Sequence, residues 1–439
     1  MHIPLRLLAA SLIIGPMAAS ASPLSGPESK LGAFIDAHNK EAETLLERVV
    51  NINSGTMNFE GVREVGKVFR AELDGLGFQT RWIDGAAFNR AGHLVGEFRG
   101  AHAGPKSPRL LLIGHLDTVF EKDSPFQTFE RLPGNKARGP GVIDMKGGDV
   151  VMVQALKALR AIGALDTMSI AVVMTGDEEK SGDPLPTARE ALVKLSESSD
   201  VAIGFEDGSG RSEEAIVARR GSTDWSLRVT GKPAHSSQIF SEKVGTGAIF
   251  EAARILDSFR KTLAGERYLT FSPGVIVGGT TAELDKSQNR GSAFGKDNVV
   301  AGQALVEGDL RTVSPEQLAS AKTRMREIVA AHLPQTDASI EFDDGYPPMA
   351  PTDGNRKLLA LYDRGSRDLG LGGVSETDPM SAGAADVAFT AGHVKMAIDG
   401  VGLMGTDDHT DRETADLATL PSQAKRAALL MYRLTRKPV

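Results

Sequence analysis

Two kinds of hydrophobic pattern alternate in the first half of the chain. Apolar residues recur at helical spacing over 31–50 and 59–76, and short, continuous apolar runs follow them. Runs of that kind are typical of strands buried on both faces, as in a sheet covered by helices. A helix predicted at about 147–162 separates two of the runs, and the order strand, helix, strand favours an α/β domain with a mostly parallel sheet. The predicted strands are 78–83, 94–98, 110–113, 169–175 and 200–205.

After about Arg220 the pattern changes. Residues 225–229 and 299–310 alternate apolar with small or polar positions, which indicates strands with one face toward water. Ser314 and Pro315 are typical of a helix N-terminus, with a serine as N-cap and a proline in the first turn. The resulting order is strand, helix, two strands, helix, strand, which predicts a small α+β domain. Its helices are expected at 246–263 and 314–333, and its other strands at 269–277 and 339–342.

The first pattern returns toward the C-terminus, where a strand at 394–398 lies between helices predicted at 356–369 and 420–434. One α/β domain is therefore expected to be interrupted by an inserted α+β domain. The predicted division is a signal peptide at 1–21, the first part of the α/β domain at 22–219, the inserted domain at 220–335 and the second part of the α/β domain at 336–439.

The N-terminal segment has the features of a secretory signal peptide. Arg6 precedes an apolar run over 7–17, and a small-residue cleavage pattern, Ala19-Ser20-Ala21, follows the run. A buried N-terminal helix is the alternative. Cleavage after Ala21 would deliver the mature protein to the periplasm or the exterior, without a membrane segment.

Composition narrows the chemistry. The formal net charge of −7, from 50 Lys and Arg against 57 Asp and Glu, argues against nucleic acid or an anionic membrane as the partner and favours a small molecule or peptide. The chain has no cysteine, so disulfides and thiolate metal sites are impossible. Any bound metal must be held by His, Asp and Glu.

Chemically versatile side chains follow the predicted buried strands. The first such strand leads into His115 and Asp117, whose side chains point to the same side of an extended chain, so that the carboxylate can orient the imidazole. A structural histidine is the alternative. Asp144 lies in a glycine-rich turn before a predicted helix, where a carboxylate can bridge two cations or simply cap the helix.

Acidic clusters follow the next two strands. Glu178 and Glu179 are adjacent, and such a pair can divide the work of metal ligand and general base; a solvated acidic turn is the alternative. Glu206 follows the next strand, and His409 lies among acids near the C-terminus. Because open α/β sheets bind ligands at the carboxyl ends of their strands, we expect these side chains to meet. Two histidines and at least three carboxylates suit two zinc-like ions that share a carboxylate.

At these residues the sequence resembles the M20 family of di-zinc metallopeptidases. The resemblance covers nearly all of the mature chain and rests on the segments GHLDTV, GPGVIDMKGG, TGDEEKSG, FED and GKPAHS together with the late histidine. The family pattern implies two Zn²⁺ ions per chain. His115 and Glu206 would bind one ion, Glu179 and His409 the other, and Asp144 would bridge both.

The same resemblance implies a mechanism and an assembly. Glu178 would take a proton from a water between the metals and return it to the leaving amine. Asp117 would orient His115, and the peptide bond after Asp144 would be cis. The inserted domain would be a ferredoxin-like lid and dimerisation domain of a homodimer. His235 would reach an active site, often that of the partner subunit, to stabilise the developing oxyanion; a polar turn histidine is the alternative.

Substrate choice depends on the segment from Asn298 to Arg311, which looks most like the glutamate carboxypeptidase branch of the family. At matching positions that branch holds the free C-terminal carboxylate of the substrate, a task that suits the planar fork of an arginine. An arginine after an edge strand is otherwise simply solvated. Two departures bear on fine specificity: Ala385 replaces the hydroxyl residue expected before Asp386, and the segment around His409 is unusually acidic.

The sequence thus predicts an exported di-zinc exopeptidase that removes a C-terminal acidic residue, above all glutamate, from a small peptide or N-acyl amino acid. Another activity of the same family, as an aminoacylase, dipeptidase or aminopeptidase, is the near alternative. A non-catalytic binding protein on this scaffold is the distant one. The joint presence of Glu178 and all five presumed ligands argues against it.

Overall fold

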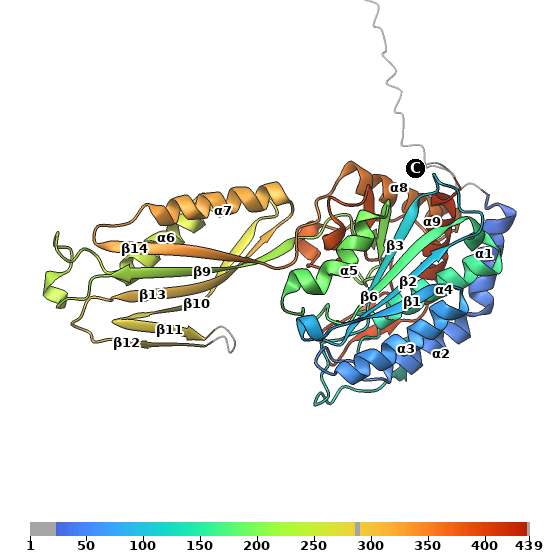
Figure 1. Cartoon of the computed structure of the whole chain (residues 1–439), viewed down its shortest axis with the longest axis horizontal. Coiled ribbons are helices and arrows are strands. Elements are labelled where there is room, and N and C mark those ends of the chain that lie inside the picture. The colour runs from blue at the N-terminus through green and yellow to red at the C-terminus, as the bar shows by residue number, and fades with distance from the viewer. Residues whose placement is uncertain (1–22, 286–289, 437–439) are drawn as a thin grey trace, which may run out of the picture.

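The computed structural model describes residues 23–285 and 290–436 of the 439-residue chain. Figure 1 shows a larger lobe rich in helices and a smaller, elongated lobe that extends from it. The predicted signal peptide at 1–21 lies outside the described residues. Within the described ranges, no helix is long and apolar enough to cross a membrane.

A six-stranded sheet forms the centre of the larger lobe. Its strands lie in the order β1 (Gln79–Asp84), β2 (Gly92–Arg99), β6 (Ser169–Thr175), β3 (Arg109–His115), β7 (Val201–Gly204) and β16 (Met396–Ile398). The last four of these run parallel, and β1 and β2 continue the sheet antiparallel at one edge. This confirms the prediction of an α/β fold with a mostly parallel sheet.

Two cores cover the two faces of this sheet. Leu110 and Leu112 of β3 belong to one core and Leu111 and Ile113 to the other, because the side chains of a strand alternate between its faces. The second core includes residues of α5 (Leu185–Glu197) and of the short helix η6 (Asp386–Thr390). The first core includes α1 (Gly26–Ala37), α2 (Asn39–Val50), α3 (Phe59–Gly75), α4 (Lys146–Ala161), α8 (Asp353–Asp368) and α9 (Thr419–Leu434).

The first predicted helix is in fact two helices. The expected helix at 31–50 is divided into α1 and α2 at His38, whose backbone leaves the helical region with φ −111° and ψ 15°. The His38 ring nitrogen Nδ1 lies 2.8 Å from the carbonyl oxygen of Phe34, where it serves the end of α1. The apolar spacing continues through the break, so the hydrophobic pattern alone does not reveal it.

The smaller lobe has a four-stranded antiparallel sheet in the order β10 (Thr270–Gly279), β13 (Gln303–Thr312), β9 (Gly221–Gly231) and β14 (Thr336–Asp344). Its core also includes residues of α6 (Ala248–Leu263) and α7 (Pro315–Ala330), and Trp225 packs edge-on against Phe259 there. The chain order strand, helix, two strands, helix, strand agrees with the predicted ferredoxin-like α+β domain.

Two details of the smaller lobe differ from the prediction. Strand β14 pairs with β9, so the lobe continues to about residue 344, and the boundary predicted between 335 and 336 cuts off its last strand. A hairpin of β11 (Thr281–Asp285) and β12 (Arg290–Phe294) was not predicted, because its sequence is short and largely polar.

Short strands tie distant segments to the edge where the parallel strands end. A four-stranded sheet in the order β17 (Gly405–Thr406), β18 (Thr414–Asp416), β5 (Lys136–Arg138) and β4 (Glu130–Leu132) brings the segment around His409 beside the glycine-rich turn that contains Asp144. Strand β8 (Glu214–Ala215) likewise pairs with β15 (Ser375–Glu376). The four-stranded sheet of β17, β18, β5 and β4 therefore brings His409 next to the turn that contains Asp144, more than two hundred positions earlier in the chain.

Candidate active site

The five predicted ligands form two groups that share one carboxylate. His115 Nε2 lies 3.0 Å from Asp144 Oδ1 and 3.6 Å from Glu206 Oε1. His409 Nε2 lies 2.8 Å from Asp144 Oδ2 and 3.1 Å from Glu179 Oε2. In each group the possible ligand atoms all lie within 4.8 Å of one another. The structure thus brings all five residues together and turns one oxygen of Asp144 toward each group.

The ends of parallel strands explain this convergence. His115 is the last residue of β3, Glu179 follows β6 and Glu206 follows β7, and these strands are neighbours in the sheet. Asp144 lies just before α4, and the Asp144–Met145 peptide bond is cis, as the family resemblance implied. His409 has a positive φ of 58° in a turn between β17 and β18.

Burial and mutual repulsion disturb the titration of these groups. Burial raises the pKa of Glu206 well above its usual value, and burial together with Asp144 raises the pKa of Glu179 to about 7. Hydrogen bonds to Asp144 and Glu179 raise the pKa of His409 to about 11. Burial opposes a charge on His115, but Glu206, Asp117 and Asp144 raise its pKa well above the usual value. Bound protons therefore offset part of the carboxylate charge.

The donor set fits two divalent cations of the zinc type. It consists of imidazole nitrogens and carboxylate oxygens without thiolates, and it is largely buried. The Oε1 atom of Glu179 is buried and has no hydrogen-bond partner among the described residues. Such an oxygen is rare in folded proteins unless something else satisfies it, and a cation would do so.

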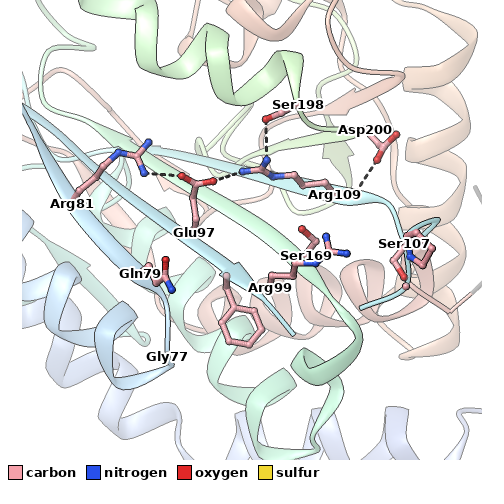
Figure 2. A pocket seen from close by; sticks show the side chains of 13 residues that line it. Gly77, Gln79, Arg81, Glu97, Arg99, Ser107, Arg109, Ser169, Ser198 and Asp200 are labelled. Carbon is pink, nitrogen blue, oxygen red and sulfur yellow. Dashed lines mark hydrogen bonds and ion pairs between the residues drawn. The ribbon is translucent and has the colours of Figure 1, made fainter. Parts of the chain in front are cut away.

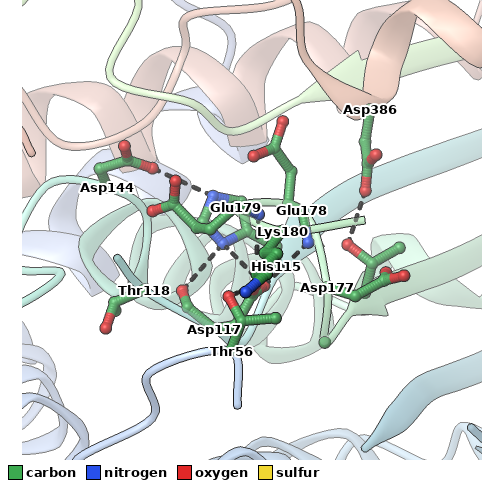
Figure 3. Close-up of polar contacts among 12 residues, drawn as sticks. Thr56, His115, Asp117, Thr118, Asp144, Asp177, Glu178, Glu179, Lys180 and Asp386 are labelled. Atoms are coloured by element: carbon green, nitrogen blue, oxygen red, sulfur yellow. Dashed lines mark hydrogen bonds and ion pairs between the residues drawn. The ribbon is translucent and has the colours of Figure 1, made fainter. Parts of the chain in front are cut away.

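Asp117 organises the turn that carries Glu178 and Glu179 (Figure 3). Its carboxylate accepts hydrogen bonds from the backbone N–H groups of Glu178 (3.1 Å) and Glu179 (3.2 Å) and from the hydroxyl of Thr56 (2.7 Å). His115 Nδ1 lies 3.0 Å from the backbone oxygen of Asp117 and 3.5 Å from its Oδ1. Asp117 therefore contacts His115 mainly through its backbone, and its carboxylate holds the acidic turn.

Glu178 has the properties of a proton acceptor beside this cluster. Burial raises the pKa of its carboxyl well above the usual value, against the opposing charge of His115. A carboxylate with a raised pKa is a stronger proton acceptor, which suits the role of general base.

Two further carboxylates hold the backbone of the site and were not predicted. Glu413 accepts hydrogen bonds from the N–H groups of Gly141 (2.9 Å), Ile143 (2.8 Å) and Asp144 (3.1 Å). Asp399 is fully buried and accepts one from the N–H group of Glu206 (3.3 Å). A signal existed for Asp399, because it directly follows the apolar strand β16.

Asn298 and His235 lie together, far from Arg311. The N–H group of Ser236 donates to the backbone oxygen of Asn298 (2.8 Å), and the backbones of His235 and Val299 form an isolated antiparallel β-bridge. Arg311 lies at the other end of β13, which has ten residues and therefore spans roughly 30 Å. Asn298 and Arg311 of the same chain are therefore too far apart to bind one substrate carboxylate together.

Arg311 lies near the joint between the lobes. Its Nε is 2.9 Å from both carboxylate oxygens of Asp309, and it is partly exposed. Arg220 lies close by: it donates a hydrogen bond to the hydroxyl of Thr270 (2.8 Å), and Thr270 is the partner of Arg311 between β10 and β13. Burial and the charge of Arg311 lower the Arg220 pKa. The region thus holds the guanidinium groups of Arg311 and Arg220, with the carboxylates of Asp309 and Asp378 near them.

A pocket lies where the parallel strands of the large sheet begin, at the opposite end from the ligand groups (Figure 2). Glu97 there pairs with Arg81 (2.7 Å) and Arg109 (2.5 Å), and Arg109 also donates to Ser198 (3.0 Å). Arg109 begins β3, whereas His115 ends it, so this pocket is separated from the ligand groups by the length of the strand.

The two candidate ligand groups suit metal-dependent hydrolysis, and the sequence comparison identifies the family of the chain. The chain matches Peptidase family M20/M25/M40 over residues 111–433. It belongs to this family and is an M20 family hydrolase, as the sequence motifs had predicted.

Individual relatives differ in activity. The chain is similar to carboxypeptidase G2 of Pseudomonas sp. (strain RS-16), with 28% identity over 395 residues that cover 89% of this chain and 88% of the relative. It is also similar to a probable succinyl-diaminopimelate desuccinylase of Staphylococcus aureus (strain MRSA252), with 30% identity over 203 residues, 45% of each chain.

Solved structures of the family share the fold. The aminopeptidase PepT from Bacillus cereus superposes with a TM-score of 0.71 at 19% identity, over 91% of this chain and 99% of that one. The YXEP protein of Bacillus subtilis, described as a dinuclear metal binding peptidase from the M20 family, has a TM-score of 0.62 at 14% identity, over 92% and 100% of the two chains.

Proposed function

We propose that this protein is a zinc-dependent exopeptidase that hydrolyses the amide bond before a C-terminal acidic residue, above all glutamate, of small peptides or N-acyl amino acids. The observation that carries the proposal is the pair of ligand groups that share Asp144 beside Glu178. Similarity to carboxypeptidase G2 over most of both chains supports a carboxypeptidase activity.

Each residue of the cluster has a task in this proposal. His115 and Glu206 would hold one Zn²⁺ and Glu179 and His409 the other, with Asp144 shared between them. When bound, the metals supply Lewis-acid polarisation of the scissile carbonyl and make a water molecule more acidic. A carboxylate oxygen of Glu178 accepts the proton of the attacking water and returns it to the leaving amine.

Arg311 is the proposed partner of the substrate's C-terminal carboxylate. Its guanidinium can bind a carboxylate with two parallel hydrogen bonds, and Arg220 adds positive charge nearby. Asp309 is bonded to Arg311 through one nitrogen, Nε, which leaves the two terminal nitrogens of the fork for a substrate. The site thus favours substrates with a free C-terminus.

A homodimer is part of the proposal, because Asn298 and His235 lie at the far end of β13 from Arg311. A second copy would supply both residues, with His235 as a donor to the developing oxyanion. Exposed aromatic side chains on the smaller lobe support an interface: Phe240 is 68% and Phe250 is 54% exposed, and their ring centroids are 5.8 Å apart. Patches of this kind often mark contact surfaces.

Export completes the proposal. The apolar run at 7–17 and the small-residue cleavage pattern that ends at Ala21 suit a protein cleaved on secretion, in the periplasm or outside the cell.

A second candidate is an N-acyl amino acid deacylase, which the similarity to a probable succinyl-diaminopimelate desuccinylase favours. The deciding experiment measures the metal content of the purified protein and its hydrolysis of N-acyl amino acids and dipeptides, with and without chelator. About two zinc ions per chain and chelator-sensitive release of glutamate are expected. Hydrolysis of N-acyl amino acids but not of dipeptides, with the same metal content, would favour the second candidate, and a metal-free inert protein would contradict both.

A further inference from the structure

Two chain segments join the lobes, and they lie against each other. Ser222 N–H donates to Tyr346 O (2.8 Å) and Gly345 N–H to Ser222 O (3.0 Å). Further along, Arg219 and Met349 exchange backbone hydrogen bonds of 3.0 and 2.9 Å. The joint is tight, because a Cβ on Gly221 would lie within 2.8 Å of the backbone oxygen of Tyr346.

The side chain of Tyr346 runs from this joint to the turn that carries Glu178. Its hydroxyl donates a hydrogen bond to the backbone oxygen of Glu178 (3.0 Å) and accepts one from Arg189 Nη2 (2.6 Å). The Arg189 guanidinium also lies over the Tyr346 ring, 5.4 Å from its centroid. Phe389 packs edge-on against the Tyr346 ring, with ring centroids 5.0 Å apart. The hydroxyl is thus held from several directions.

Arg189 connects this contact to the rest of the acidic turn. Its side chain is 1% exposed, and its nitrogens lie 2.6 Å from Asp177 Oδ1 and 2.8 Å from Asp386 Oδ1. Asp386 also accepts a hydrogen bond from the hydroxyl of Thr175, the last residue of β6 (2.6 Å). The turn after β6 is therefore fixed by Asp117 on one side and by Arg189 and Tyr346 on the other.

The other crossing segment makes an equivalent connection. Arg219 Nε lies 2.7 Å from Asp399 Oδ2, and the other oxygen of Asp399 accepts a hydrogen bond from the N–H group of Glu206 (3.3 Å). Each segment that joins the lobes thus reaches a loop of the ligand cluster through a polar side chain. A role in fold stability alone does not require that both connections end at residues of the cluster.

We propose that Tyr346 is a positioning residue for Glu178, through which the joint between the lobes sets the orientation of the general base. The inference rests on the proposed role of Glu178. The Tyr346 hydroxyl fixes the Glu178 carbonyl, and with it the direction of the Glu178 side chain. A base displaced by about 1 Å loses much of its catalytic effect, although substrate and metal still bind.

Tyr346→Phe tests the inference, because it removes the hydroxyl and keeps the ring that packs on Arg189. Tyr362→Phe in α8 is a matched control, since Tyr362 is also buried but belongs to a helix of the core. The measurements are kcat and KM for an N-acyl glutamate, zinc content, and hydrogen exchange of residues 176–181 in the metal-free protein. We expect kcat to fall about tenfold or more in Tyr346→Phe, with KM and zinc content unchanged and exchange of this segment faster. Tyr362→Phe should leave exchange of this segment and kcat unchanged.

Wild-type kcat and wild-type exchange in Tyr346→Phe would overturn the inference. Loss of zinc, or faster exchange throughout the larger lobe, would also overturn it, because the hydroxyl would then have a general structural role. Glu178→Gln separates this failure from failure of the proposed function. If Glu178→Gln kept wild-type turnover, the base itself would be misassigned, whatever the exchange of residues 176–181 showed.

Discussion

The carboxylate of Glu413 accepts a hydrogen bond from the backbone N–H group of Asp144 (3.1 Å), although 269 positions separate the two residues in the chain. The same carboxylate holds two more N–H groups of the glycine-rich turn. Glu413 is completely buried, and burial raises its pKa to about 8. The position of the shared carboxylate therefore depends on a residue that belongs to neither ligand group.

Glu413→Gln should weaken metal binding. The amide oxygen can still accept, but the NH₂ group then faces backbone donors, so the turn that presents Asp144 loses part of its support. Changes to such supporting groups usually lower metal affinity about 10- to 100-fold. Competition with a zinc chelator measures this, and Asp411→Asn, an exposed change in the same segment, is the control. Equal zinc affinity in all three proteins would remove the supporting role.

Arg311→Ala should raise KM for substrates with a free C-terminus far more than for the same substrates with an amidated C-terminus. Loss of a bidentate pair to a carboxylate costs on the order of 1.5–3 kcal/mol, or about 10- to 100-fold in KM. Steady-state kinetics on matched free and amidated substrates provide the test. An equal effect on both would end the role of Arg311 as a carboxylate partner.

Metal affinity should fall as the pH falls. In the metal-free protein His409, with a pKa of about 11, carries a proton at neutral pH, and Glu179, with a pKa of about 7, gains one as the pH drops below that value. A metal must displace these protons, so binding releases protons and strengthens with rising pH, by about tenfold per pH unit for each proton. Zinc titrations between about pH 6 and 8, in buffers of different ionisation enthalpy, measure both effects. A pH-independent affinity would contradict this assignment of protons.

Two inactive variants should restore activity when they are co-expressed, if the partner subunit completes the site. Glu178→Ala damages the site of its own chain, and His235→Ala damages the site of the partner, so a mixed dimer contains one intact site. Statistical mixing predicts recovery of about a quarter of wild-type turnover. Glu178→Ala with Arg311→Ala is the control, because both changes act on the chain's own site and no mixed dimer contains an intact one. Failure of the first pair to recover, with dimers present, would contradict shared sites.

The sequence was most informative where a buried strand ends in a polar residue. The strand predicted at 169–175 has the observed bounds, and His115, Glu178, Glu179 and Glu206 lie where their strands led us to expect. Carboxylates that follow several buried parallel strands are the pattern expected of a ligand site at the carboxyl ends of those strands. The convergence of these side chains was therefore predictable from the order of the strands alone.

Contacts between distant segments were the part that the sequence did not reveal. Nothing near Glu413 indicates that it accepts three N–H groups of the turn around Asp144, and Tyr346 reads as an ordinary residue after a strand. Local patterns also failed to separate α1 from α2 and to predict α5. Propensity and periodicity describe neighbours along the chain, whereas these features depend on partners that only the folded sheet supplies.

Strand β16 lies beside β7 in the large sheet, although the whole of the smaller lobe separates them along the chain. On a growing polypeptide the smaller lobe is complete once residue 344 has been made, whereas the larger one still lacks its last parallel strand. Until β16 has been made, β7 is an unpaired edge strand, and unpaired edges can pair with other chains. His409 follows later still, so the ligand group of Asp144, Glu179 and His409 is completed only after synthesis of nearly the entire chain, whereas the group of His115, Asp144 and Glu206 is complete much earlier.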